Sequence, residues 1–284
     1  MDYFFFIDLI QSTVDGLLFG TTYALIGIGF TLIFGVMRKL NLAYGAAALA
    51  GTYIGLVMFL TFDAHPAIVF LASAIGSGLI GLVVYLCCFR FTPENYPMAS
   101  LLASVGMLLF IDEVVIHASH GLPYPYPSVF RDAIIEIGDV WVRGDLLFVF
   151  FMCVVAMGIL FWLLYRTPLG LATRAVSQQP RAAQLCGIDV TRVNMMTFGI
   201  AGLLGGIAGA MTAAAVGVLS PVIAMGLTVK GLIVVVIGGL GFIPGAIIAG
   251  LLVGAAENIF LLVRGVTERD IYVMLLLFIF LTLR

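Results

Sequence analysis

The side chain best placed to do chemistry is the carboxylate of Glu257, which about a dozen apolar or small residues precede. An ionisable group at membrane depth usually faces the interior of a helix bundle, where it pairs or serves a pathway. Asn258 is its neighbour, and Asn41 and Tyr44 begin another apolar run. Each polar group would be costly against lipid, so each either lines a pathway or makes an interhelical hydrogen bond. For Asn258 we expect the hydrogen bond.

Other chemistries have little support in the sequence. It contains no G-x-x-x-x-G-K-[ST] phosphate loop, so we do not expect this chain to hydrolyse ATP. The three histidines have no metal-site spacing with cysteines or carboxylates, so we expect neither a metal nor another cofactor. The four cysteines read as small apolar side chains, and no nucleophile–base arrangement stands out. The chain is therefore not predicted to be an enzyme.

The composition indicates what must position these groups. Hydrophobic residues make up 63% of the chain and charged residues only 10%, against roughly 25% charged residues in soluble domains. Apolar runs of transmembrane length recur from end to end, and the acidic N-terminus lacks the basic region of a cleavable signal peptide. The charges lie in short loops, so no nucleic-acid partner is expected. We predict an all-α polytopic integral membrane protein with about eight or nine transmembrane or re-entrant helices, forming one domain over residues 1–284.

The apolar runs give nine candidate segments, of which 225–241 need not cross the membrane fully. The segments are 17–37, 40–62, 67–89, 98–116, 145–165, 195–219, 225–241, 244–263 and 271–283.

Lysine and arginine set the expected orientation. With the N-terminus outside, seven basic residues up to residue 219 fall in cytoplasmic loops and two in outer loops, as the positive-inside rule requires. This makes 166–194, the basic loop, cytoplasmic and 117–144 an outer loop. Beyond residue 219 the sequence leaves the topology open, because a re-entrant segment would reverse the sides of the last arginines. The seven are Arg38, Lys39, Arg90, Arg166, Arg174, Arg181 and Arg192, and the two are Arg131 and Arg143.

The basic loop carries four arginines against one aspartate. Gly170 and Pro180 are expected to break it, and 181–186 suits a short helix. Gly187 then stands where a helix C-terminal glycine should, and Asp189 can cap the next helix. An ordered two-helix loop between spans suggests a docking surface. The alternative is a retention loop whose arginines only fix orientation.

Glycine is abundant, with 33 residues. In the sixth span Gly202, Gly205, Gly206 and Gly209 are spaced for close helix packing, which drives helix association in lipid. The run 238–245, GGLGFIPG, should instead interrupt a helix. A broken helix at membrane depth is tolerated where protein or a water-filled cavity surrounds it, so the run is a re-entrant or pathway-lining element or a simple loop.

Three stretches carry a family resemblance. Residues 20–45, GTTYALIGIGFTLIFGVMRKLNLAYG, are similar to a Tyr-Ala-Leu and Leu-x-Phe-Gly-Val run followed by Asn-x-Ala-His-Gly. Residues 169–188 resemble a Leu-Gly…Arg-Ala…Ala-Ala…Gly-Ile loop, and 238–245 with Glu257 resemble Gly-Gly-Leu-Gly-x-x-x-Gly and a following glutamate. In this order they resemble the permease subunit of branched-chain amino acid ATP-binding-cassette importers over nearly the whole chain.

The resemblance implies that the basic loop docks into a groove on a cytoplasmic ATPase subunit and transmits its closure to the spans. The residues that would make this contact are Arg174, Ala182, Ala183, Gly187 and Ile188. The translocation pathway would involve Asn41, Tyr44, Gly45, Gly239 and Glu257.

The implied assembly holds a second, related permease chain, two ATPase chains and a periplasmic substrate-binding protein that meets the outer loop. Its place is the bacterial inner membrane, which the chain crosses many times. Tyr44 stands where the family has histidine, and Arg38 and Lys39 are more basic than is typical. The implied substrates are branched-chain or other hydrophobic amino acids, and these departures add small amides, urea and other carboxylates.

A competing hypothesis from a different class is an ion- or proton-coupled secondary transporter in which Glu257 is the relay. It predicts transport by this chain alone, without nucleotide. A structural scaffold without transport has no feature in its favour.

Overall fold

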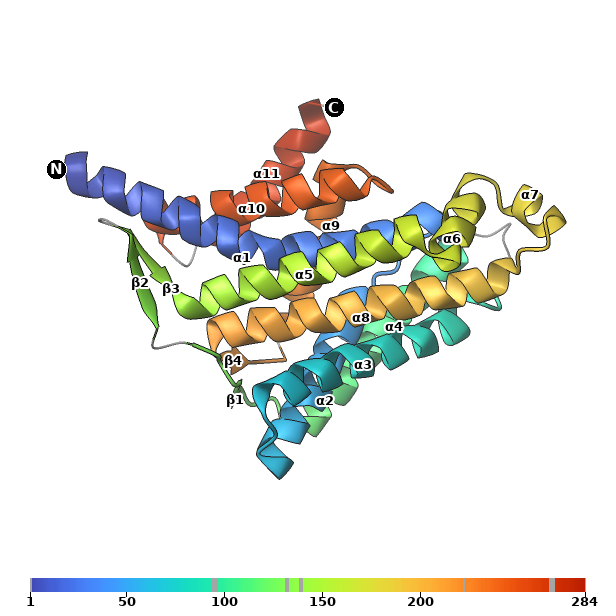
Figure 1. The fold of residues 1–284 in the computed structure, drawn as a ribbon, viewed down its shortest axis with the longest axis horizontal. Coiled ribbons are helices and arrows are strands. Elements are labelled where there is room, and N and C mark those ends of the chain that lie inside the picture. The colour runs from blue at the N-terminus through green and yellow to red at the C-terminus, as the bar shows by residue number, and fades with distance from the viewer. Residues whose placement is uncertain are drawn as a thin grey trace.

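The computed structural model describes residues 2–92, 97–130, 133–137, 140–221, 223–265 and 269–283. In this part of the chain helices dominate, with two small two-stranded antiparallel sheets (Figure 1). The elements are α1 (Asp2–Met37), α2 (Tyr44–Phe62), α3 (Pro66–Val84), the π-helical η1 (Tyr85–Phe89), α4 (Pro97–Ala118), β1 (Tyr124–Pro125), β2 (Ile134–Ile137), β3 (Val140–Arg143), α5 (Gly144–Arg166), α6 (Pro168–Gln178), α7 (Pro180–Leu185), α8 (Val190–Val216), β4 (Val218–Leu219), α9 (Ile223–Gly238), α10 (Ile243–Arg264) and α11 (Arg269–Leu283).

Seven of the described helices are long and apolar enough to cross a membrane, and α9 is a shorter apolar helix. This confirms the predicted class of all-α, multi-spanning protein. The 16 residues of α9 rise only about 24 Å at 1.5 Å per residue, short of a hydrocarbon core of about 30 Å. The seven are Phe5–Met37, Tyr44–Phe62, Pro66–Phe89, Met98–Ala118, Gly144–Arg166, Val190–Val216 and Ile243–Val263.

Two predicted helix starts are wrong, for opposite reasons. Helix α1 begins at residue 2 rather than 17, because polar residues before the apolar run are also helical. Gln11 and Asp15 lie one turn apart, and a side-chain hydrogen bond of 2.9 Å between them stabilises this part of the helix. Helix α2 begins at Tyr44 rather than 40, because Asn41 forms a turn: its Oδ1 accepts a hydrogen bond of 3.1 Å from the Ala43 amide.

The long helices run side by side and separate the loops into two groups. The start of α1 and the β2–β3 hairpin lie at one end of the bundle, and α6 and α7 lie at the other (Figure 1). Helix α1 packs against α10, α8, α5 and α9, and α3 lies against both α2 and α8. The outer loop contributes β1, which pairs with β4 so that Tyr124 faces Leu219.

Glycines allow these helices to approach closely. A Cβ added to Gly20 of α1 would lie 2.9 Å from the Gly250 carbonyl oxygen of α10. One added to Gly202 of α8 would lie 2.6 Å from the Ser77 carbonyl oxygen of α3, and Gly206 meets α3 one turn later. This confirms the close packing expected at Gly202 and Gly206, and Gly20 adds a contact of the same kind that the spacing had not indicated. Such close contact stabilises helix association in lipid, where the hydrophobic effect does not.

The run 238–245 breaks a helix, as predicted. Helix α9 ends at Gly238, and Gly239 and Gly241 have positive φ angles of 92° and 85°, which glycine adopts without strain. Helix α10 starts at Ile243, with Pro244 in its first turn. A Cβ on Gly35, near the end of α1, would lie 3.5 Å from Gly241 Cα. This glycine turn therefore sits at the same end of the bundle as α6 and α7.

The substitution Gly250→Leu should destabilise the protein by roughly 1–3 kcal/mol, because its side chain would overlap the backbone of Ala24 and push α10 from α1. Thermal unfolding of the purified protein in detergent measures this. Gly158→Leu is the matched control, since a Cβ at Gly158 meets no described heavy atom within 4 Å. Equal loss in both variants would contradict the packing argument.

Candidate coupling loop and intramembrane polar site

Helix α6 begins inside the basic loop with a strong start signal. The Thr167 side chain accepts a hydrogen bond of 3.2 Å from the Gly170 amide, and Pro168 occupies the first turn. Gly170 therefore lies within α6, and the prediction that it breaks the chain is wrong. Its missing side chain has another use, because a Cβ there would lie 2.5 Å from the Leu163 carbonyl oxygen. The glycine lets α6 fold back tightly on the end of α5.

The second half of the loop follows the predicted plan. Helix α6 ends at Gln178, Pro180 starts α7, and α7 covers Pro180–Leu185, close to the expected 181–186. Gly187 has a φ of 84°, the left-handed conformation of a C-terminal glycine. The Asp189 side chain caps α8 by accepting a hydrogen bond of 3.1 Å from the Arg192 amide.

A small apolar cluster fixes this loop to the bundle. Val36 of α1, Val176 of α6, Ala183 of α7 and Val193 of α8 are buried together, and Ile188 packs against them. We call these five residues the loop core. Because the loop core draws on four helices, α6 and α7 are held as one body against the end of α1.

The residues predicted to contact an ATPase divide by exposure. Arg174, Ala182 and Gly187 are exposed, whereas Ala183 is only 5% exposed and Ile188 is partly buried in the loop core. The most exposed large apolar side chain on α7 is Leu185, at 91%. Leu185 was not among the predicted contact residues, although it lies two positions after Ala183 and a helix therefore turns it to the opposite face.

Arg174 connects the loop to the glycine turn. Its guanidinium lies 5.2 Å from the centre of the Tyr165 ring on α5, and its Nε donates a 3.4 Å hydrogen bond to the Gly170 carbonyl oxygen. Together with Gly241 and Pro244, Arg174 lines a cavity of about 260 Å³ that also reaches the end of α1. Arg174 and the junction of α9 and α10 therefore border the same cavity.

Among the predicted pathway residues, Tyr44 and Asn41 are buried at 2% and 3% exposure. The Tyr44 hydroxyl donates a 3.0 Å hydrogen bond to the Ala201 carbonyl oxygen of α8, and its ring meets Phe30 edge-on at 4.7 Å between centroids. The Asn41 side chain is engaged in its own turn. Both side chains thus bind within the bundle at the start of α2.

Glu257 forms an ion pair that the sequence analysis did not identify. Its Oε1 lies 2.6 Å from Nζ of Lys230 on α9, and the two side chains are 1% and 16% exposed. The same Nζ donates a 3.3 Å hydrogen bond to the Tyr23 hydroxyl of α1. An isolated lysine in an apolar segment was the available signal, because such a charge needs a partner at membrane depth.

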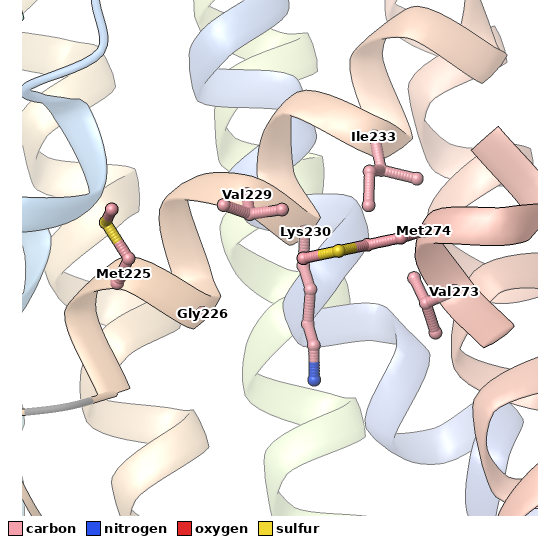
Figure 2. A pocket seen from close by; sticks show the side chains of 7 residues that line it. All are labelled: Met225, Gly226, Val229, Lys230, Ile233, Val273 and Met274. Carbon is pink, nitrogen blue, oxygen red and sulfur yellow. The ribbon is translucent and has the colours of Figure 1, made fainter. Parts of the chain in front are cut away.

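Lys230 also forms part of the wall of a cavity of about 270 Å³ between α9 and α11. Figure 2 shows its side chain extended from α9, with Val229 and Ile233 on the same helix and Val273 and Met274 facing from α11. The cavity is apolar apart from the lysine. Because the Lys230 ammonium is already paired with Glu257, the wall offers a mainly apolar surface, which suits the apolar part of a small ligand.

Helix α9 meets both parts of the predicted pathway. A Cβ added to Gly45 would lie 2.9 Å from Thr228 Cα, Glu257 pairs with Lys230, and Gly239 directly follows the helix. Asn258 is different: its Nδ2 donates 3.3 Å to the Gly254 carbonyl oxygen of the same helix, so the expected interhelical bond is wrong.

Comparisons with known proteins agree on one family. The family model described as branched-chain amino acid transport system / permease component matches residues 12–283. The chain is 28% identical to the high-affinity branched-chain amino acid transport system permease protein BraD of Pseudomonas aeruginosa, over 97% of this chain and 94% of that protein. It is 26% identical to the corresponding LivH protein of Escherichia coli K12, over 89% and 86%.

A solved structure supports the fold alone. PsaBC from Streptococcus pneumoniae in complex with Fab matches 97% of this chain and 90% of that chain, with a TM-score of 0.51 and 12% identity. The family match confirms the resemblance read from the sequence, and with it a multi-pass permease component that is not itself catalytic.

Removing one partner of the intramembrane pair should destabilise the protein more than removing both. Glu257→Met leaves the Lys230 ammonium without its carboxylate and should cost about 3 kcal/mol, whereas Lys230→Met with Glu257→Met should recover most of this. Thermal unfolding of the three proteins gives the comparison. A double variant as unstable as the single variant would exclude the pair as the cause.

Proposed function

Because the chain belongs to the family of permease components of branched-chain amino acid transport systems, we propose that it forms half of a translocation pathway and couples it to cytoplasmic ATPase subunits. One observation carries this proposal: a two-helix loop is anchored to α1 by a buried core and exposes a leucine at its tip. A loop whose arginines only fixed the orientation of the protein in the membrane would need neither a buried core nor an exposed leucine. The proposal treats residues 1–284 as one permease domain.

The coupling contact centres on α7. Leu185, with Ala182 and Gly187 beside it, inserts into the ATPase groove, where the small residues allow close approach. Ala183 and Ile188 act from behind, since they hold α7 on the loop core. The loop core then passes a displacement of α7 to α1, which packs against α9 and α10. The short distance between α7 and the glycine turn favours their movement as one rigid body.

The pathway runs along α9. Asn41, Tyr44 and Gly45 border it on one side and Glu257 on the other, while Gly239 supplies the flexible joint at its end. The Lys230–Glu257 pair makes α9 and α10 move together against α2 and α8. Closure and separation of the ATPase pair would in this way open and close the pathway in turn, with the glycine turn as the joint.

As a permease component the chain works with ATPase subunits and other transporter chains. The finer assignment, which we propose, has one related second permease, two ATPases and a periplasmic binding protein that docks on the outer loop 117–144. The substrates are branched-chain or other hydrophobic amino acids, or small amides and carboxylates of similar size. The mainly apolar cavity between α9 and α11 supports the apolar side chain that these substrates share.

Reconstitution tests the proposal. The chain with its co-purifying partners should take up substrate into liposomes in the presence of ATP and the binding protein, and the chain alone should not. Uptake by the chain alone, driven by an ion gradient without nucleotide, would support the secondary transporter instead.

Leu185→Asp should abolish or strongly reduce co-purification of the ATPase while leaving the chain folded, because a side chain that is 91% exposed makes few contacts within it. Pull-down from detergent extracts measures the recovered ATPase per permease. This variant is sharper than one at Gly187, whose φ of 84° strains any larger residue. Leu122→Asp, at a 58% exposed site in the outer loop, is the matched control and should retain the ATPase. Normal recovery with Leu185→Asp would refute this docking site.

A further inference from the structure

A third cavity, of about 510 Å³, opens where α1 ends and the basic loop folds back. Three cationic residues line it: Arg38 and Lys39, which follow α1, and Arg181 of α7. No carboxylate is among its described lining residues, and none of the three cations forms an ion pair within the described ranges. We call this cavity the basic groove. Among the described residues, none neutralises its positive charge.

Asp189 is the carboxylate nearest in sequence to the lining, and it is already engaged. It caps α8 through the Arg192 amide, and its other oxygen lies 3.8 Å from Arg192 Nε. The remaining polar groups of the groove are the uncharged amides of Gln179, Gln184 and Asn194. Guanidinium, ammonium and amide groups together suit a phosphate or similar oxyanion.

The backbone at Arg38 gives an independent argument. Helix α1 ends at Met37, and Arg38 has a φ of 53°, with its amide donating 2.7 Å to the Phe34 carbonyl oxygen. This is the left-handed cap position that glycine occupies at lowest cost. An arginine there is less favourable for the backbone than glycine, and binding of its guanidinium to an anion in the basic groove would offset that cost.

The apolar part of the groove indicates the size and nature of the anion. Val36, Met37, Val176 and Val190 lie beside the three cations. Val36 and Val176 are already buried in the loop core, but Met37 and Val190 are partly exposed, and a small inorganic anion would leave them uncovered. A phospholipid offers a phosphate and, next to it, the glycerol and the first methylenes, which can cover them. Because α1 is a membrane span, its end lies at the bilayer surface, where such headgroups are found.

We propose that the basic groove binds a phosphate-bearing anion at the cytoplasmic membrane surface, and that the headgroup of an anionic phospholipid is its source. The bound phosphate joins the end of α1 to α7 and so bears on the coupling loop. The lipid site rests on the proposed function in one respect only, namely that α6 and α7 face the cytoplasm. Lipid binding is measured independently of ATPase recovery, so the two can fail separately.

Native mass spectrometry of the intact assembly, titrated with phosphatidylglycerol or phosphatidylcholine, tests the proposal. The wild type should retain phosphatidylglycerol at a site that phosphatidylcholine does not fill. Arg38→Gly and Lys39→Gln should each weaken this binding about tenfold, as expected for one charged hydrogen bond. Arg38→Gly should also keep its thermal stability, because glycine fits the cap, so lost binding cannot be ascribed to unfolding.

Arg166→Gln is the matched control, since it removes one positive charge of the same cytoplasmic surface without lining the groove. Equal weakening by Arg166→Gln, or equal retention of both lipids, would overturn the proposal, because the effect would then reflect net charge alone. Displacement of the lipid by millimolar inorganic phosphate would assign the groove to a soluble anion and overturn the lipid source. Lipid binding only after the ATPase chains are removed would also overturn it, because the groove would then belong to the subunit interface.

Discussion

Close backbone contact along α1 is the constraint on which this structure depends. Lipid offers apolar helices no incentive to associate, so they stay together only where packing is tight. Glycines on α1 and α10 bring the two backbones within reach along most of their length, and α8 and α3 are joined in the same way. This frame leaves α4, α5 and α11 with large exposed apolar faces, which suit lipid or partner chains.

Within that frame, the short helix α9 carries the polar contacts. Its Lys230 pairs with Glu257 of α10 and bonds to Tyr23 of α1, so three helices meet at one charged site. An ion pair at this depth is costly to break, and it therefore fixes the register of the helices that share it. The glycine turn at the end of α9 provides freedom where the ion pair provides rigidity.

The loop core, the glycine turn and the basic groove lie together at the end of the bundle that carries α6 and α7. The loop core holds α6 and α7 against α1, Arg174 reaches the cavity beside the glycine turn, and the basic groove opens between the end of α1 and α7. In the proposed coupling, a load on Leu185 would reach α9 and α10 through the loop core and α1, which packs against both helices. The proposed lipid site lies between α7 and the end of α1, so a bound lipid headgroup would affect the position of α7 in the coupling contact.

The sequence by itself determined the class of protein, the close packing at the glycines of the sixth span, the helix break at 238–245 and the short helix α7 between Pro180 and Gly187. Each follows from composition or from residues a few positions apart. It also indicated Glu257, because a carboxylate among apolar residues is conspicuous. Only the tertiary structure decided that Lys230 is its partner, that Ala183 faces inward while Leu185 faces outward, and that Arg38, Lys39 and Arg181 share a groove. The physical reason is that these relations depend on which face of each helix packs against its neighbours and at what depth, and packing sets this rotation and depth rather than the local sequence.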